Sequence, residues 1–120
     1  MTLQRRTRLS RPAEFSSVFQ NAVASTDASF KVLARNTGQS HSRLGMAVSR
    51  QVDRRAVARN RLKRIIRESF RLHYLTDSKH TAVDVVVLPR RQASSLCNKR
   101  LFIQLSQHWD RIDQRVSKES

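Results

Sequence analysis

The chain has 120 residues, which is enough for one domain with a single modest hydrophobic core. It carries 24 Lys and Arg residues against nine Asp and Glu, which gives a formal net charge of +15. A single cysteine, Cys97, excludes a disulfide framework and a cysteine-based zinc site, and we expect it to be a buried small apolar residue.

The charge balance indicates the class of partner. A compact domain with so much charge of one sign repels itself unless a polyanion relieves the repulsion. Most of the cations are arginines, which favour bidentate capture of phosphate oxygens. Nucleic acid is therefore the leading partner class, and an anionic membrane surface is the alternative. The N-terminus lacks the apolar segment of a secretory signal and no apolar run approaches membrane-spanning length, so we expect a cytoplasmic protein.

The first segments are a basic stretch and a short helix. Residues 1–11 contain four arginines and little to bury, which indicates a flexible basic arm or a disordered tail without a role. Pro12 suits the first position of a helix. Two phenylalanines on one helical turn usually pack in a core, although the same pattern fits a surface on which bases stack. The apolar residues at helical spacing are Phe15, Val18, Phe19 and Ala22.

Two strands are predicted next. Residues 23–29 are small and polar and indicate a loop, with a short edge strand as the alternative. Residues 30–35 alternate as a strand, and residues 43–50 form a second one. One face of the second strand holds only small residues, so that a packed helix or a ligand can approach the backbone closely. These small residues are Gly45, Ala47 and Ser49.

The segment from Asp53 to Tyr74 is predicted to be a basic helix. Asp53 is expected to cap its first turn, and Val52 is expected to pack on Val57 as a hydrophobic staple. The charge is almost all of one sign, which destabilises a helix unless an anion binds. The apolar stripe is Ala58, Leu62, Ile65, Ile66, Ser69 and Phe70, and the opposite face carries Asn60, Lys63, Arg64, Arg67 and Arg71.

The last two elements are a strand and a helix. Residues 82–88 are the most β-prone run and are apolar on both faces except for Asp84, as expected of a central strand. Ser94 or Ser95 is expected to cap a final helix that runs to about Arg115. The apolar stripe of that helix is Leu96, Leu101, Leu105, Trp109 and Ile112, with Phe102 beside it. Strands separated by helices predict a two-layer α/β sandwich.

Groups for autonomous catalysis are missing from this pattern. The acids are scattered; only Asp110 and Asp113 share a helical face, and we interpret them as solvated surface acids. The four histidines show no metal-ligand spacing. We therefore expect a binding protein without catalytic residues and without a metal site.

One motif resembles a known family. Arg59-Asn60-Arg61, followed by Lys63, Arg64 and Arg67, resembles the signature of the protein subunit of bacterial ribonuclease P. The resemblance covers nearly the whole chain and is closest to proteobacterial members. The segments RLSRPAEFSSVF, RLGMAVSR and DVVVLPR and the helix with Trp109 follow in the family's order.

The resemblance implies a function and a fold. In this family a catalytic RNA, which requires Mg²⁺, removes the 5′ leader of precursor tRNA, and one protein per RNA assists without holding a cofactor itself. The family fold has the order α-β-β-β-α-β-α, a four-stranded sheet, a left-handed βαβ crossover and a likeness to a ribosomal-protein domain. It implies an extra strand near residues 22–26, a domain over residues 12–115 and a tail over residues 116–120.

The resemblance also implies two sets of site residues. One set binds the catalytic RNA, and the other lines a cleft for the 5′ leader between the first helix and the sheet. The first set is Arg50, Arg54, Arg55, Arg59, Asn60, Arg61, Lys63, Arg64, Arg67 and Arg71, and the second is Phe15, Phe19, Lys31, Leu33, Arg35 and Arg90.

Two other readings explain the charge. A general basic RNA-binding protein, such as a ribosomal component, fits the composition but leaves the motif unexplained. Membrane association would need a free apolar face opposite the cations, which the predicted strands require for their own core.

Overall fold

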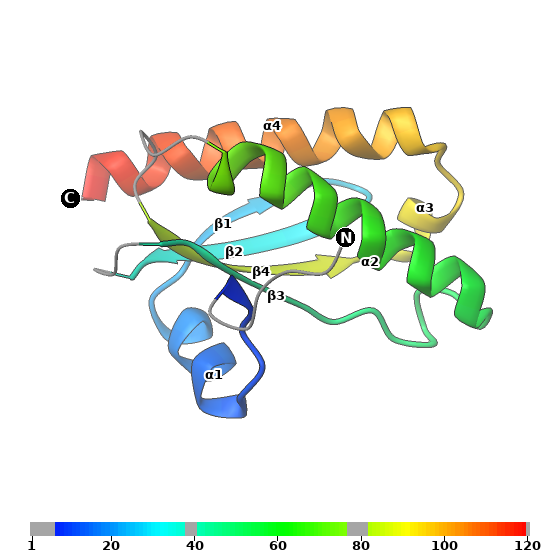
Figure 1. Ribbon diagram of the computed structural model, residues 1–120, viewed down its shortest axis with the longest axis horizontal. Coiled ribbons are helices and arrows are strands. Elements are labelled where there is room, and N and C mark those ends of the chain that lie inside the picture. Colours follow the sequence, from blue (N-terminus) through cyan, green and yellow to red (C-terminus); the bar gives the residue numbers. More distant parts are fainter. Residues whose placement is uncertain (1–6, 38–40, 77–81, 120) are drawn as a thin grey trace.

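The computed structural model describes residues 7–37, 41–76 and 82–119. Within these ranges no helix is long and apolar enough to cross a membrane. The elements follow the predicted order, including the strand expected near residues 22–26, and two short helical segments are added (Figure 1). In chain order they are α1 (Pro12–Gln20), β1 (Val23–Thr26), β2 (Phe30–Asn36), β3 (Arg43–Met46), α2 (Ala56–Phe70), the π-helical segment η2 (Arg71–Leu75), β4 (Val83–Pro89), α3 (Arg91–Ser94) and α4 (Asn98–Glu119).

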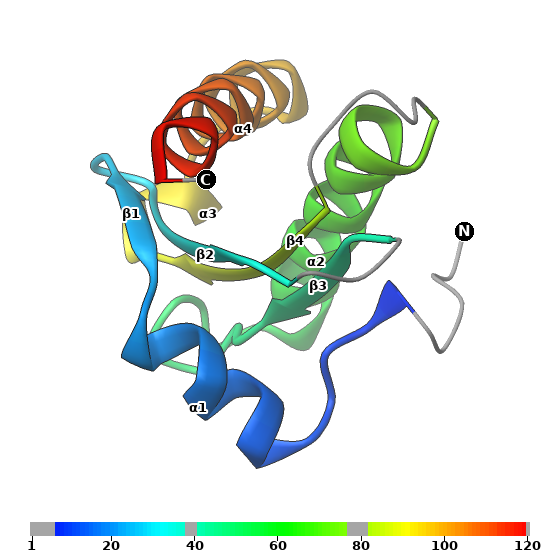
Figure 2. The same cartoon turned by 90° about the vertical axis from the view of Figure 1, so that its left-hand side faces the viewer.

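The four strands form one mixed sheet in the order β1-β2-β4-β3. β1 pairs with β2 and β2 pairs with β4 in antiparallel fashion, whereas β3 and β4 are parallel and are joined through α2. α2 and α4 cover one face of the sheet, and α1 lies on the other (Figure 2). This α+β fold confirms the predicted four-stranded sheet, including the edge strand β1.

The main core lies between the sheet and the two long helices. All six residues of the stripe predicted for α2 are buried. They meet the inward residues of the strands, such as Val32 and Val85, and the stripe of α4. Each buried aliphatic side chain contributes about 1.5–3 kcal/mol. The indole of Trp109 donates a hydrogen bond from Nε1 to the Ser69 hydroxyl at 2.8 Å, which leaves neither polar group unsatisfied.

A smaller core lies beneath α1 on the opposite face. Val18 of α1 is fully buried against Leu33 and Val86, and Leu9 joins them from the segment before the helix. Phe19, in contrast, is 49% exposed. The core residue of α1 is therefore Val18, and the exposed ring is available to a ligand.

The segment before α1 differs from the expected flexible arm. The Leu9 N–H donates to the Leu44 carbonyl at 2.8 Å, Arg8 forms a parallel bridge with Leu44, and Leu9 is buried. Residues 7–9 thus lie along the outer edge of β3, because Leu9 finds a pocket there. Residues 1–6 lie outside the described part of the chain.

The start of α2 also differs from the prediction. The helix begins at Ala56, and Asp53 accepts the N–H of Arg55 at 2.8 Å in a turn that precedes it, so Asp53 does not cap the first turn. Val57 is 75% exposed, which excludes the expected staple with Val52. The strand before it ends at Met46 rather than Arg50, although Ala47 still donates its N–H to the Val87 carbonyl of β4 at 3.2 Å.

The C-terminal helix begins later and ends later than predicted. Ser94 ends the short α3 and donates its hydroxyl to Asp53, and Ser95 bonds the Gln92 carbonyl, so neither serine caps α4. α4 continues to Glu119 through the expected tail, because Val116 still reaches the core. Cys97, in the turn between the helices, is exposed rather than buried.

A buried histidine fastens the β1–β2 hairpin to α4. His108 is fully buried, its Nδ1 lies 2.7 Å from the Ser25 hydroxyl, and its Nε2 lies 2.8 Å from Oδ2 of Asp27. The other oxygen of Asp27 accepts the N–H groups of Ser29 and Phe30, which shapes the hairpin turn. Burial lowers the pKa of His108, and Asp27 only partly opposes this effect.

This arrangement predicts a loss of stability in acid. Because the pKa of His108 is lower in the folded protein, the unfolded chain binds more protons as the pH falls below about 6.5, the ordinary value for histidine. The stability that neutral His108 gives to the folded protein is therefore fully present above that pH and is lost as the pH falls below it. We expect the drop in melting temperature between about pH 8 and about pH 5.5 to be smaller in His108→Gln than in the parent. An NMR titration of the His108 ring with a midpoint at or above the ordinary value would contradict this expectation.

Candidate nucleic-acid interface

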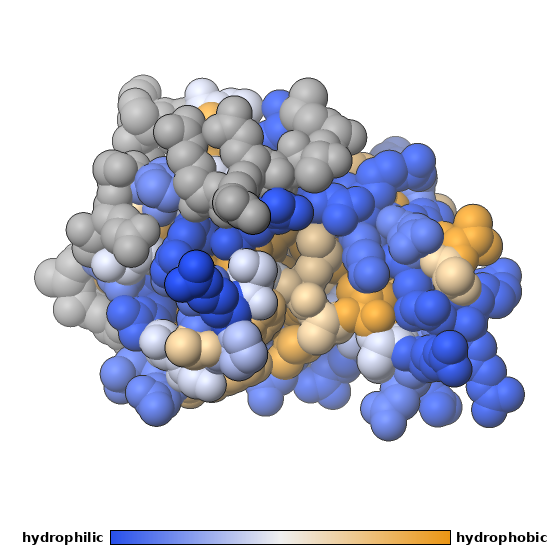
Figure 3. Space-filling model, turned by 60° about the horizontal axis from the view of Figure 1, so that its bottom comes forward, coloured by the Kyte–Doolittle hydropathy of each residue, from blue (hydrophilic) through white to orange (hydrophobic). Residues whose placement is uncertain are grey.

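α1 covers only part of its face of the sheet. Beneath the helix the sheet is apolar, with Leu33 paired to Val86 across β2 and β4. One step further along these strands, the exposed Lys31 pairs with the half-buried Leu88. Apolar side chains lie in a hollow on this face, with hydrophilic side chains on either side (Figure 3). The uncovered part of the sheet is therefore a cleft with an apolar floor and a polar rim.

An arginine fork fixes α1 over the sheet. Arg43 of β3 holds the Asp84 carboxylate through Nε at 2.8 Å and through a terminal nitrogen at 2.7 Å. Its other terminal nitrogen holds Glu14 of α1 at 2.7 Å. Glu14 also accepts the N–H groups of Arg11 and Ser10 at the start of the helix, and these bonds, together with Arg43, lower its pKa.

Gly45 permits the close approach of α1. A Cβ placed on Gly45 would lie 2.8 Å from two ring atoms of Phe15 and 3.0 Å from Cβ of Leu9. The small face predicted for this strand therefore serves two purposes. Gly45 receives the helix, whereas Ala47 and Ser49 line an open depression.

That depression lies at the open end of the sheet. It has a volume of about 470 Å³ and includes two cationic residues at the end of β4. The small face predicted for the strand of residues 43–50 contributes Ala47 and Ser49, and Arg90 is also predicted, but the other lining residues are not, because they meet only in the folded chain. The lining residues are Ala47, Ser49, Gln51, Val52, Leu88, Pro89, Arg90 and Arg91.

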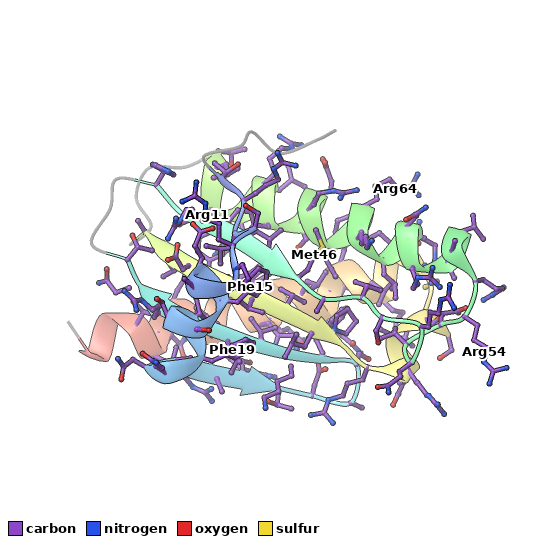
Figure 4. The ribbon with its side chains drawn as sticks, turned by 90° about the horizontal axis from the view of Figure 1, so that it is seen from below. Arg11, Phe15, Phe19, Met46, Arg54 and Arg64 are labelled. Carbon is purple, nitrogen blue, oxygen red and sulfur yellow. The ribbon has the colours of Figure 1, made fainter. Side chains whose placement is uncertain are left out.

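Of the six residues expected at this cleft, Arg90 lines the depression, whereas Leu33 is buried beneath α1. Phe15 and Phe19 lie on α1 beside the strands (Figure 4). Lys31 is exposed on the floor and Arg90 is exposed at the end of β4. Arg35 holds α1 on the sheet, because a terminal nitrogen of its side chain donates to the Ser17 carbonyl of α1 at 3.1 Å.

The second candidate surface is the outer face of α2. An open concavity of about 620 Å³ runs along this helix. Arg64 projects outward from α2, and Arg54 projects outward from the turn before α2 (Figure 4). The residues that line the concavity lie three or four positions apart, as expected of one helix face. They are Arg55, Val57, Ala58, Asn60, Arg61, Arg64 and Arg67.

Two arginines of the Arg-Asn-Arg motif also hold the fold together. Arg59 donates from one terminal nitrogen to the carbonyls of Asp53 and Arg54, at 3.0 and 2.8 Å. Arg61 donates to Oδ1 of Asn98 at 2.6 Å and to two carbonyls of the α3–α4 turn, each at 3.1 Å. Arg59 retains donors on its remaining nitrogens. The two residues thus brace the loops at either side of the basic face.

The other arginines of α2 and of the segments beside it differ in whether they have a partner. Arg55 pairs with Asp53, and Arg71 pairs with Glu68. Arg50, Arg54 and Arg64 are exposed, and no carboxylate within the described ranges pairs with them. Arg67 has a buried Nε that lacks a hydrogen-bond partner in the described part of the chain. An anion on this face would meet guanidinium groups that are free to bind it.

The carboxylates beside the cleft have partners of their own. The carboxylates near the cleft, Glu14 and Asp84, are both occupied by Arg43. The donor set of these two surfaces is cationic, which suits phosphate and not a metal ion.

The contacts of Arg61 and the exposure of Arg64 predict effects of different size on the free energy of unfolding. Arg61→Ala should lower the free energy of unfolding by about 1–3 kcal/mol, because three hydrogen bonds to a charged group are lost. Arg64→Ala should change it by less than about 0.5 kcal/mol, since this side chain is exposed. Urea unfolding of both variants measures the difference, and equal values would refute the division between bracing and free arginines.

Comparison with known proteins agrees with this geometry. The sequence model of the family Ribonuclease P matches residues 3–113. The Ribonuclease P protein component of Methylococcus capsulatus is 42% identical over 113 residues, which are 94% of this chain and 86% of the relative. That of Vibrio cholerae is 40% identical over 108 residues, which are 90% of this chain and 89% of the relative.

Solved structures show the same fold. The RNase P protein of Staphylococcus aureus matches with a TM-score of 0.77 at 28% identity, covering 87% of this chain and 93% of that one. The RNase P protein of Thermotoga maritima matches with a TM-score of 0.72 at 29% identity, covering 89% of this chain and 96% of that one. The chain therefore belongs to the bacterial ribonuclease P protein family.

Proposed function

We propose that this chain is the non-catalytic protein subunit of ribonuclease P, a ribonucleoprotein endoribonuclease of the cytoplasm. It binds the catalytic RNA, one protein per RNA, and assists removal of the 5′ leader from precursor tRNA. The observation that carries the proposal is the pairing of two surfaces on one family fold: a helix face with free guanidinium groups and an apolar cleft with a cationic rim.

The two surfaces suit different parts of an RNA. Phosphates of a folded RNA match the face of α2, where Arg64 and Arg54 stand free. A single strand has unstacked bases, which match the exposed ring of Phe19 and the apolar floor near Leu88, while Lys31 and Arg90 lie within reach of its phosphates. We therefore assign the catalytic RNA to α2 and the leader to the cleft.

The proposed contribution of the protein is electrostatic. Phosphates are crowded where substrate meets catalytic RNA, and protein cations replace some of the metal ions that would otherwise neutralise them. Mg²⁺ remains a requirement of the RNA, which carries out the hydrolysis.

A processing assay at low Mg²⁺ tests this function. Adding the purified chain to a bacterial ribonuclease P RNA should stimulate cleavage of precursor tRNA. Shortening the 5′ leader to about one or two nucleotides should weaken substrate binding by the assembled complex, because the cleft is then empty. A general basic RNA-binding protein would bind both substrates equally, and that result would reject the leader assignment.

The salt dependence of RNA binding tests the α2 face. Arg64→Ala and Arg67→Ala should each weaken binding of the catalytic RNA and reduce the slope of log K against log salt by about 0.7–0.9. Arg115→Ala, which removes an exposed arginine on α4, is the matched control and should leave the slope unchanged. Parent-like slopes in both arginine variants would remove α2 from the interface.

Substitution of Phe19 tests the cleft. Because this ring is 49% exposed, Phe19→Ala should keep nearly the parent melting temperature and weaken binding of the leader by about 1–3 kcal/mol. Val18→Ala is the contrasting variant, since that side chain is fully buried and its loss should lower the melting temperature. Unchanged leader affinity in Phe19→Ala would contradict the assignment.

A further inference from the structure

A cluster of possible metal ligands lies away from both RNA surfaces. It sits where η2 meets α4, on the face of the sheet opposite α1. His73, Asp110 and Asp113 each offer one ligand atom there, and these atoms all lie within 4.8 Å of one another. Small side-chain rotations would bring the three atoms around one ion, which would replace the hydrogen bond between His73 and Asp113.

The backbone explains how these three residues meet. Asp110 and Asp113 lie three positions apart on α4, so their side chains share one side of the helix. The π-helical turn of η2 is wider than an α-helical turn, and it brings two consecutive residues to the same carboxylate. His73 Nε2 lies 2.7 Å from Oδ2 of Asp113, and the Tyr74 hydroxyl donates to Oδ1 at 2.9 Å. π-helical turns are rare and occur frequently at functional sites.

The surroundings hold the ligands in a fixed orientation. Tyr74 is 6% exposed and packs on Phe70 and Trp109, with ring centroids 5.2 and 5.7 Å apart. The His73 ring packs edge-on against Tyr74, with centroids 4.5 Å apart. The tyrosine hydroxyl therefore acts as an outer-shell donor to one oxygen of Asp113 and directs the other oxygen toward His73. Outer-shell hydrogen bonds of this kind orient metal ligands in proteins.

The electrostatics of the cluster favour a cation. Two carboxylates are set close together in a chain that has only nine acids against 24 basic residues. Asp110 is exposed and makes no hydrogen bond or ion pair within the described part of the chain, so its position is not explained by an internal partner. A bound cation would relieve the repulsion between the two carboxylates.

We propose that His73, Asp110 and Asp113 bind a divalent first-row transition metal ion such as Zn²⁺. One imidazole nitrogen and two carboxylate oxygens suit Zn²⁺ better than Mg²⁺, which prefers oxygen ligands alone. Three protein ligands leave a fourth position for water. The ion would join the C-terminal end of α2 to α4 and thereby stabilise the seam between the two helices that cover the sheet.

Metal titration of the free protein tests this proposal without RNA. The chain is first treated with EDTA, which is then removed, and ZnCl₂ is added at about pH 7.5, where neutral histidine is available as a ligand. We expect one ion to bind per chain in isothermal titration calorimetry and the melting temperature to rise with the concentration of Zn²⁺. Mg²⁺ at the same concentrations should leave the melting temperature unchanged.

Two variants identify the site. Asp110→Asn should keep or slightly raise the melting temperature without metal, because Asp110 is exposed and its charge repels Asp113, and it should bind Zn²⁺ at least about tenfold more weakly than the parent. Cys97→Ser is the control, since an exposed thiol can bind Zn²⁺ by itself, and this variant should bind Zn²⁺ as the parent does. Parent-like Zn²⁺ affinity in Asp110→Asn, loss of binding in Cys97→Ser, or no binding by the parent would each overturn the proposal.

Discussion

The position of α1, and with it the existence of a cleft, depends on the Arg43 fork. Asp84 is nearly buried on the central strand, where an unpaired carboxylate would be strongly destabilising. Arg43 compensates that charge with two hydrogen bonds and uses its remaining terminal nitrogen to hold Glu14 of α1. The helix is thereby fixed over one end of the sheet, at the point where Gly45 allows Phe15 to approach. Because the fork determines which part of the sheet is covered, it also determines which part of the sheet stays open.

Some arginines of the basic helix also have partners within the fold. A net charge of +15 therefore does not mean that every arginine is free to bind phosphate. Arg61 donates hydrogen bonds to the α3–α4 turn and Arg59 donates to the loop before α2, whereas the Arg64 side chain is exposed. The family motif thus combines two functions at adjacent positions: arginines that shape the surface and side chains that present it. Substituting a bracing arginine alters the surface indirectly, so that weakened RNA binding alone does not identify a phosphate contact.

The sequence predicts those features that rest on a regular period. The stripe of α2 follows directly from burial against one core, and all six of its predicted residues are buried. Features that depend on tertiary partners are missed. Asp53 and Ser94 look like helix caps in the sequence, yet they bond with each other across 41 positions because the folded chain brings their turns together. Cys97 looks like a core residue on a continuous helix, but the interruption between α3 and α4 leaves it in solvent.

The partners of the histidines could not be predicted from the sequence, because spacing along the chain does not show which residues of another element lie nearby. His108 finds Asp27 and Ser25 on the edge hairpin, and His73 finds Asp113 on α4. Both fasten α4 to the rest of the fold, but their settings differ. His108 is enclosed, with both ring nitrogens occupied and no route for an ion. His73 lies at the surface end of the helix seam, beside a second and exposed carboxylate. That difference in access and in charge is why a metal site is proposed for one histidine and a purely structural role for the other.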